Sequence, residues 1–164
     1  MLDISQISLA QGVLGICPLP GRSGLYEADL QTIVRWQPGL VLTMTPLSEL
    51  ERAGAAEFPA DLAQAGIKWL QCPITDFGAP SPAEMPLWDA ISQVAHRVLQ
   101  EKGRILAHCY GGCGRSGMAL LRLMCEAGTP VDAALARLRA VRPCAVETDA
   151  QKHWAAQGAE RAPF

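Results

Sequence analysis

The pattern of apolar and polar positions along the chain predicts strands and helices in alternation. Short runs rich in Ile, Leu and Val predict buried strands, and apolar residues repeated every three or four positions predict helices. The expected strands are residues 7–16, 40–44, 68–72 and 105–108. The expected helices are residues 27–37, 47–52, 59–65, 82–101, 116–127, 130–141 and 149–157. Alternation of this kind predicts an α/β fold in which a central, mostly parallel sheet is flanked by helices.

The composition indicates that these elements form one compact domain. Hydrophobic residues make up 49% and charged residues 18% of the 164 residues, which is typical of a folded protein. No linker, repeat or low-complexity tract divides the chain, so we expect a single domain over residues 1–164, with residues 158–164 as a frayed tail. A net charge of −2 without any basic run argues against nucleic acid as a partner.

Neither a membrane anchor nor an export signal is predicted. The first ten residues lack the basic start and apolar core of a signal peptide, and no apolar stretch reaches membrane-spanning length. We therefore expect a cytoplasmic protein that makes no membrane contact. Without secretion, the six cysteines do not indicate disulfides, and their spacing does not fit a metal site. No metal or other cofactor is expected.

One segment carries the candidate chemistry. Residues 108–116, with the sequence HCYGGCGRS, lie between the last predicted strand and an apolar helix. The three glycines allow backbone N–H groups to converge on one point, and the N-terminus of the following helix adds partial positive charge. These features predict a cradle for a tetrahedral oxyanion such as phosphate. The expected substrate-binding residues are Tyr110, Gly111, Gly112, Cys113, Gly114 and Arg115.

The side chains of this cradle predict phosphoryl transfer. The amides that would bind phosphate would also stabilise a Cys109 thiolate, which is the form of cysteine that attacks phosphorus. Arg115 offers a planar fork of donors for two phosphate oxygens. Ser116 can donate a hydrogen bond to the sulfur when phosphocysteine is hydrolysed, and it can also cap the helix. His108 is expected to support the loop from beneath through hydrogen bonds.

Departure of an alkoxide or phenoxide requires a proton donor, and Asp76 is the expected general acid. It lies in residues 75–82, where Gly78 can act as a hinge and two prolines keep the segment out of a helix. The alternative is that Asp76 only caps a turn. We favour the catalytic role because the chain offers no other carboxylate in an equivalent place.

The loop resembles the signature of the cysteine-dependent protein tyrosine and dual-specificity phosphatases. More narrowly, the chain is similar to the cyclin-dependent-kinase-associated phosphatases and their bacterial relatives, over residues 14–21, 66–67, 73–80, 145–148 and 151. The resemblance implies a phosphate loop between a strand and a helix, a phosphocysteine intermediate, and Asp76 on a mobile acid loop. It also implies phosphotyrosine, phosphoserine or phosphothreonine proteins as substrates and a protein kinase as a partner. For Gln151 it implies orientation of the hydrolytic water, although Gln151 fits a capping box with Thr148 equally well.

The sequence also allows two other enzyme classes and one binding function. A rhodanese-type sulfurtransferase and an arsenate reductase use similar oxyanion loops, and a phosphoprotein-binding module would keep the loop without turnover. The combination of Cys109, Arg115 and Asp76 favours the phosphatase. Residues 110–114 contain no lysine, which argues against highly charged inositol lipids as substrates.

Three further residues have two interpretations each. Arg22 either touches the substrate or is an exposed turn residue, the commoner case. Cys72 and Cys113 are expected to be small packing residues. The alternative is that one of them forms a disulfide with oxidised Cys109 and protects it from irreversible oxidation.

Overall fold

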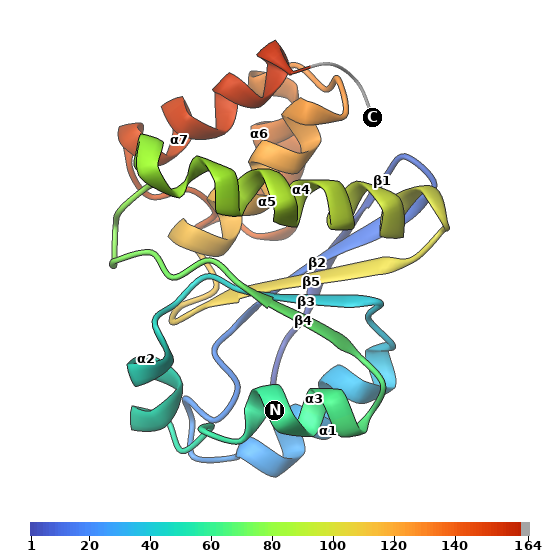
Figure 1. The fold of residues 1–164 in the computed structure, drawn as a ribbon, viewed down its shortest axis with the longest axis vertical. Helices are drawn as coiled ribbons and strands as arrows, with labels where there is room; N and C mark the ends of the chain where they lie inside the picture. The colour runs from blue at the N-terminus through green and yellow to red at the C-terminus, as the bar shows by residue number, and fades with distance from the viewer. Residues whose placement is uncertain (162–164) are drawn as a thin grey trace.

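A computed structural model describes residues 1–161 and contains a five-stranded sheet with helices on both faces (Figure 1). The strands follow the order β1-β2-β5-β3-β4. Strands β2, β5, β3 and β4 are parallel, and β1 is antiparallel to β2. The predicted mostly parallel sheet is therefore confirmed. The strands are β1 (Ser5–Leu9), β2 (Gly12–Pro18), β3 (Leu40–Thr43), β4 (Lys68–Gln71) and β5 (Arg104–Cys109).

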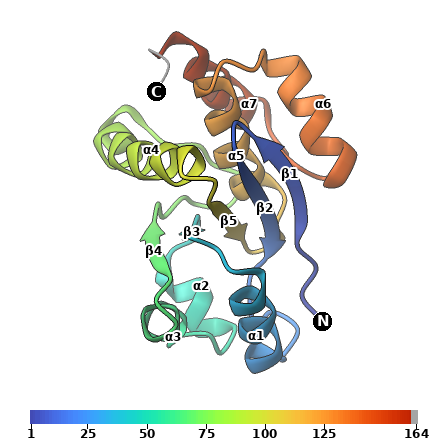
Figure 2. The ribbon, with the colours of Figure 1, turned by 90° about the vertical axis from the view of Figure 1, so that its right-hand side faces the viewer.

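Helices cover the two faces of the sheet in two groups, as Figure 2 shows. One group consists of α1 (Tyr26–Trp36), α2 (Leu47–Arg52) and α3 (Phe58–Gln64). The other group consists of α4 (Met85–Gln100), α5 (Gly114–Glu126), α6 (Val131–Val141) and α7 (Asp149–Ala156). Two 3-10 helices, η1 (Pro82–Glu84) and η2 (Gln157–Glu160), adjoin α4 and α7.

The central strands bury both of their faces, which explains their continuous apolar runs. In β5, Ile105 and Ala107 pack in the core beneath α4 and α5, whereas Leu106 packs in the core beneath α1 and α3. The same alternation holds in β3, where Leu40 and Leu42 face one core and Val41 faces the other. Because successive side chains of a strand point to opposite faces, one short apolar run serves two cores.

The prediction of a single strand over residues 7–16 is wrong. The chain reverses at Ala10 and Gln11, and β1 pairs with β2 in a hairpin whose last pair joins Leu9 to Gly12. Ala10 adopts a positive φ of 52° there. The tight turn carries none of the Asn-Gly or Asp-Gly pairs that usually signal one, so an apolar pattern alone did not show it.

The prediction of a frayed tail is wrong for residues 158–160. Residues 157–160 form η2, and Gly158 is buried against α5, where a Cβ atom would lie 2.9 Å from the Arg122 carbonyl oxygen. Residues 162–164 lie outside the described part of the chain. Within residues 1–161, no helix combines the length and apolar character needed to cross a membrane.

A buried carboxylate ties α5 to α4. Glu126 accepts hydrogen bonds from Trp88, Ser92 and Arg122, and its carboxylate lies 3.0 Å from His96 Nε2. Burial alone would raise the pKa of Glu126, but these hydrogen bonds outweigh it and hold the pKa at about 2. This pKa lies below the ordinary value of 4.5. Ionised Glu126 therefore stabilises the fold fully when the pH is above about 4.5. The contribution is lost as the pH falls towards 2.

Replacing Glu126 by alanine should lower the free energy of unfolding by about 3–5 kcal/mol at neutral pH, because the buried Arg122 guanidinium loses its partner. Urea denaturation at neutral and acidic pH measures the effect. The variant should also lose less stability on acidification than the original protein. Glu160→Ala, which removes an exposed carboxylate, is the matched control and should change stability by about 0.5 kcal/mol or less. Equal losses in the two variants would contradict this account.

Candidate active site

The predicted loop lies at the carboxyl end of the central strand β5. Cys109 ends β5, and α5 begins at Gly114. Parallel sheets bind ligands beyond the carboxyl ends of their strands, and β5 runs between its parallel neighbours β2 and β3. Cys109 is 3% exposed, so its sulfur lies at the floor of the loop rather than on the surface.

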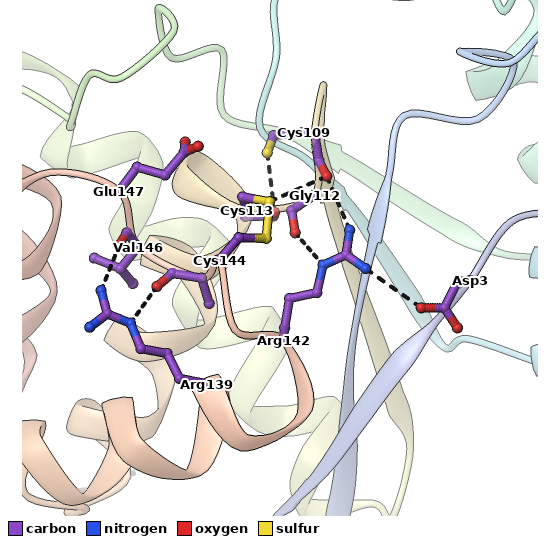
Figure 3. Close-up of a disulfide and its surroundings, with 12 residues drawn as sticks. Asp3, Cys109, Gly112, Cys113, Arg139, Arg142, Cys144, Val146 and Glu147 are labelled. Carbon is purple, nitrogen blue, oxygen red and sulfur yellow. Dashed lines mark hydrogen bonds and ion pairs between the residues drawn. A yellow bond between two sulfur atoms is a disulfide. The ribbon is translucent and has the colours of Figure 1, made fainter.

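Groups outside the loop hold its carbonyl oxygens. Arg142, at the end of α6, donates from Nε to the Gly112 oxygen at 2.9 Å and from Nη2 to the Gly111 oxygen at 3.1 Å (Figure 3). Leu19 N donates to the Tyr110 oxygen at 3.2 Å. With its carbonyls bonded outwards, the loop keeps its N–H groups for an anion. Gly112 has a φ of +68° and passes Cys17 so closely that a Cβ atom would lie 2.4 Å from the Cys17 carbonyl carbon.

A disulfide joins Cys113 to Cys144, with a Cα–Cα distance of 5.2 Å (Figure 3). It connects the loop to the segment between α6 and α7. The predictions that Cys113 is a packing residue, and that the chain has no disulfide, are therefore wrong. The Cys113 sulfur is bonded to Cys144 and Cys109 is a free thiol, so a bond between Cys113 and Cys109 would require the Cys113–Cys144 disulfide to open first. Cys72 is a buried free thiol, as the packing interpretation expects, and burial raises its pKa to about 12.

Hydrogen bonds hold the two ends of the loop. The Cys109 sulfur lies 3.2 Å from Ser116 Oγ in the first turn of α5. His108 is fully buried, and its Nε2 lies 2.7 Å from Thr43 Oγ1, which also accepts a hydrogen bond from Trp69 Nε1. Burial lowers the pKa of His108 to about 3, so the imidazole is neutral at physiological pH. The side-chain hydrogen bond therefore joins β5 to β3, and the role of His108 in supporting the loop stays a prediction.

Glu49 fixes the orientation of Arg115, a contact that the sequence did not predict. Arg115 Nη1 and Nη2 donate to the two Glu49 carboxylate oxygens at 2.8 and 3.0 Å, and Nη1 also donates to the Ile74 oxygen. Burial would lower the pKa of Arg115. The hydrogen bonds with Glu49 and the nearby Cys109 and Asp76 outweigh burial, so the pKa is raised above its ordinary value. Arg115 Nε is buried and has no hydrogen-bond partner among the described residues. The pairing therefore leaves one edge of the guanidinium for an anion.

Asp76 lies beside the loop, as predicted. Its Oδ1 is 3.4 Å from Arg115 Nη2 and accepts a hydrogen bond from Phe77 N. Its side chain is 60% exposed. Phe77 adopts a positive φ of 60°, which is uncommon for an aromatic residue. A hollow of about 190 Å³, which we call the Cys109 hollow, adjoins the loop. Its lining consists of Asp76, Phe77, Cys109, Tyr110, Gly111, Cys113, Gly114 and Glu147.

Gln151 forms the predicted capping box and also contacts the segment that carries Asp76. Its backbone N donates to Thr148 Oγ1, and its Oε1 accepts from the Thr148 and Glu147 N–H groups. Its Nε2 donates to the Gly78 oxygen at 3.2 Å. The buried side chain thus links α7 to the segment that carries Asp76. Its role towards water remains a prediction.

Glu147 is a second carboxylate at this site that the sequence analysis did not single out. Its Oε2 lies so close to the start of α5 that a Cβ atom on Gly114 would be 2.1 Å away. Glu147 stands within the segment 145–148, but only its neighbours in space show that it faces the Cys109 hollow. Arg22 also lies near the site, with its guanidinium 5.0 Å from the centre of the Tyr110 ring.

Residues 21–129 match the family Tc-R-P, described as "Polymorphic toxin system, DSP-PTPase phosphatase". No match was found among curated proteins.

Solved structures of phosphatases are similar over nearly the whole chain. Kinase associated phosphatase, with serine in place of its catalytic site cysteine, is 23% identical, with 97% of this chain and 94% of that chain covered and a TM-score of 0.84. Tk-PTP in the active form is 27% identical, with 96% and 98% covered and a TM-score of 0.74. Human DUSP28 is 13% identical, with 95% and 93% covered and a TM-score of 0.65. Since the family match spans more than half of the sequence, the chain belongs to the Tc-R-P family and is a protein phosphatase of the DSP-PTPase class.

Proposed function

We propose that this phosphatase hydrolyses phosphate monoesters of phosphotyrosine and of phosphoserine or phosphothreonine through a phosphocysteine on Cys109. The observation that carries the proposal is the hollow in which Cys109, the glycine-rich loop and Asp76 meet. We further propose that residues 1–164 act as one phosphatase domain.

In the first step, the Cys109 thiolate attacks phosphorus, so that an S–P bond forms as the P–O bond to the leaving group breaks. Asp76 gives its proton to the leaving oxygen. Backbone N–H groups of residues 110–115 and the free edge of Arg115 bind the other phosphate oxygens, where charge spreads in the transition state. The contact between Arg115 and Glu49 orients the guanidinium before the substrate arrives.

In the second step, water attacks the phosphocysteine and the S–P bond breaks. The Asp76 carboxylate accepts the proton of the water, and Ser116 donates a hydrogen bond to the departing thiolate. The distance of 3.2 Å between Ser116 Oγ and the Cys109 sulfur supports this role. Gln151 is proposed to position the acid loop and the hydrolytic water, because its amide already binds the Gly78 oxygen.

The hollow supports substrates of both classes. The hollow is small, about 190 Å³, and the Tyr110 ring at its edge is exposed, which is consistent with the shallow opening that we propose. A shallow opening admits the short side chains of phosphoserine and phosphothreonine as well as phosphotyrosine. Hydrolysis rates on matched phosphopeptides of the three kinds test this, and activity confined to phosphotyrosine would contradict it.

A phosphorylated protein kinase is the proposed partner class, which is supported by the resemblance of the sequence to kinase-associated phosphatases. The cytosol is the proposed compartment. The disulfide between Cys113 and Cys144 bears on the compartment, since cytosolic thiols are kept reduced. Alkylation before cell lysis tests it: thiols that are free in the cell would support the cytosol, and a bond that persists there would contradict it. Capture of a phosphorylated kinase by the Cys109→Ser protein tests the partner.

Replacing Asp76 by asparagine should lower kcat by about 10²- to 10³-fold for esters with poor leaving groups, because the amide cannot donate the proton. For an aryl phosphate whose leaving group needs no proton, the loss should be much smaller. The basic limb of the pH profile should also flatten. Asp132→Asn, which changes an exposed carboxylate on α6, is the matched control. A loss that does not depend on the leaving group would move the acid to another residue.

A further inference from the structure

A second hollow adjoins the Cys109 hollow, and it contains charged side chains that the mechanism does not use. It has a volume of about 380 Å³ and is lined by Arg22, Glu49, Arg52, Ala53, Asp76 and Tyr110. We call it the flanking hollow. Asp76 and Tyr110 line both hollows, so the two share a rim. A peptide whose phosphorylated residue enters the Cys109 hollow would therefore pass close to the flanking hollow.

The charges of the flanking hollow favour an anion. Arg22 and Arg52 are exposed, and within residues 1–161 neither forms an ion pair with a carboxylate. Arg52 Nε donates to the backbone oxygen of Ser48, which leaves its charge uncompensated. The negative charge of Glu49, in contrast, is matched by its pair with Arg115.

Two further observations support this charge balance. Arg115 Nη2 also lies 3.4 Å from Asp76 Oδ1, so both carboxylates of the flanking hollow contact this guanidinium rather than Arg22 or Arg52. Arg22 lies over the Tyr110 ring, a cation–π contact that places the guanidinium at the rim between the hollows. Two guanidinium groups, those of Arg22 and Arg52, therefore line the flanking hollow, and within residues 1–161 neither is paired with a carboxylate.

We propose that the flanking hollow is a binding subsite for a second anionic group of the substrate, and this rests on the proposed protein phosphatase function. The group is a carboxylate or a second phosphate on a residue one or two positions from the phosphorylated residue. In an extended peptide such side chains lie within about 4–7 Å of each other along the backbone, which suits two hollows with a common rim. A guanidinium binds either oxyanion through paired hydrogen bonds.

Three matched phosphotyrosine peptides test the subsite. One has alanine on both sides of the phosphotyrosine, one has glutamate there, and one has phosphoserine there. The measured quantity is the ratio of kcat/KM for each acidic peptide to kcat/KM for the alanine peptide. At low ionic strength we expect a ratio of about 5 to 20, decreasing as salt is added. In the double variant Arg22→Gln, Arg52→Gln the ratio should fall to about 1.

Arg97→Gln is the control for loss of a positive charge elsewhere. Arg97 is exposed on α4, on the face of the sheet opposite α2, so its replacement removes one positive charge far from the flanking hollow. The control should keep the ratio of the original protein. Because a ratio is compared within each variant, a general loss of activity in the double variant does not imitate loss of the subsite.

The outcomes separate the subsite from the proposed function. A preference for both acidic peptides means that a carboxylate is sufficient, and a preference for the phosphoserine peptide alone identifies a second phosphate; both support the subsite. A ratio near 1 in the original protein, a ratio retained in the double variant, or an equal decrease in Arg97→Gln would overturn it. Failure to hydrolyse any peptide or small aryl phosphate would instead overturn the phosphatase function on which it rests.

Discussion

Replacing Cys109 by serine should lower kcat for a small aryl phosphate by about 10⁵-fold. A serine hydroxyl is not ionised at neutral pH, and no base within hydrogen-bond reach of this position is seen that would activate it among the described residues. The loop amides and Arg115 do not change, so phosphate and phosphopeptides should still bind. The expected result is therefore loss of turnover with retention of binding.

Steady-state kinetics and calorimetric titration with phosphate measure the two halves of this prediction. Cys125→Ser is the matched control, because Cys125 is a free, buried thiol on the same helix that follows the loop. It should keep kcat within a few-fold provided that the thermal midpoint shows a folded protein. Turnover by Cys109→Ser at a rate close to that of the control would remove Cys109 as the nucleophile.

Replacing Arg115 by lysine should lower kcat by about 10³-fold, although the positive charge is kept. Lysine cannot span the Glu49 carboxylate and two phosphate oxygens at once, because its ammonium is a single point of charge. Glu49→Gln, which keeps the shape but removes the charge that orients Arg115, should cost about 10-fold. That smaller loss should fall mainly on kcat if Glu49 acts by positioning Arg115.

Transient kinetics on the two variants separates binding from chemistry. Arg115→Lys should weaken the binding of phosphate as well as lower kcat, whereas Glu49→Gln should change the affinity for phosphate less than it changes kcat. An Arg115→Lys enzyme with the original kcat would contradict the account of transition-state binding. A loss from Glu49→Gln as large as that from Arg115→Lys would assign Glu49 a direct role.

The sequence predicted the features of the site that depend on neighbouring residues. The turn from β5 into α5 needs only the contiguous residues 108–116, whose glycines and strand-to-helix context are visible in the pattern. The predicted α/β alternation places this turn at the carboxyl edge of the sheet. Asp76 follows β4, another parallel strand, so its arrival at the same edge agrees with the predicted topology.

The contacts that the sequence did not reveal come from distant segments. Glu49 reaches Arg115 across 66 positions, and Arg142 reaches the loop carbonyls across about 30. Cys144 is 31 residues from Cys113, and their pairing depends on where the end of α6 docks. None of these residues has a local pattern that marks its role. Only the packing of helices on the sheet brings these partners together.

The disulfide and Arg142 act on the same part of the loop from the same segment of the chain. Cys113 is held through its sulfur, and Gly111 and Gly112 are held through their carbonyl oxygens. Arg142 is in turn 3.6 Å from the Asp3 carboxylate (Figure 3). The loop geometry that binds an oxyanion is therefore supported by the segment between α6 and α7 as well as by β5 and α5.

The most direct test of the account is capture of the phosphocysteine during turnover. The Asp76→Asn protein should be mixed with an aryl phosphate whose leaving group needs no proton, quenched rapidly in denaturant, digested, and analysed by mass spectrometry. The first step then stays fast while the second lacks its base, so the intermediate accumulates. The account predicts a phosphoryl group on Cys109 in the peptide that contains residues 108–115. Turnover with that peptide unmodified, or with the phosphoryl group on another residue, would contradict it.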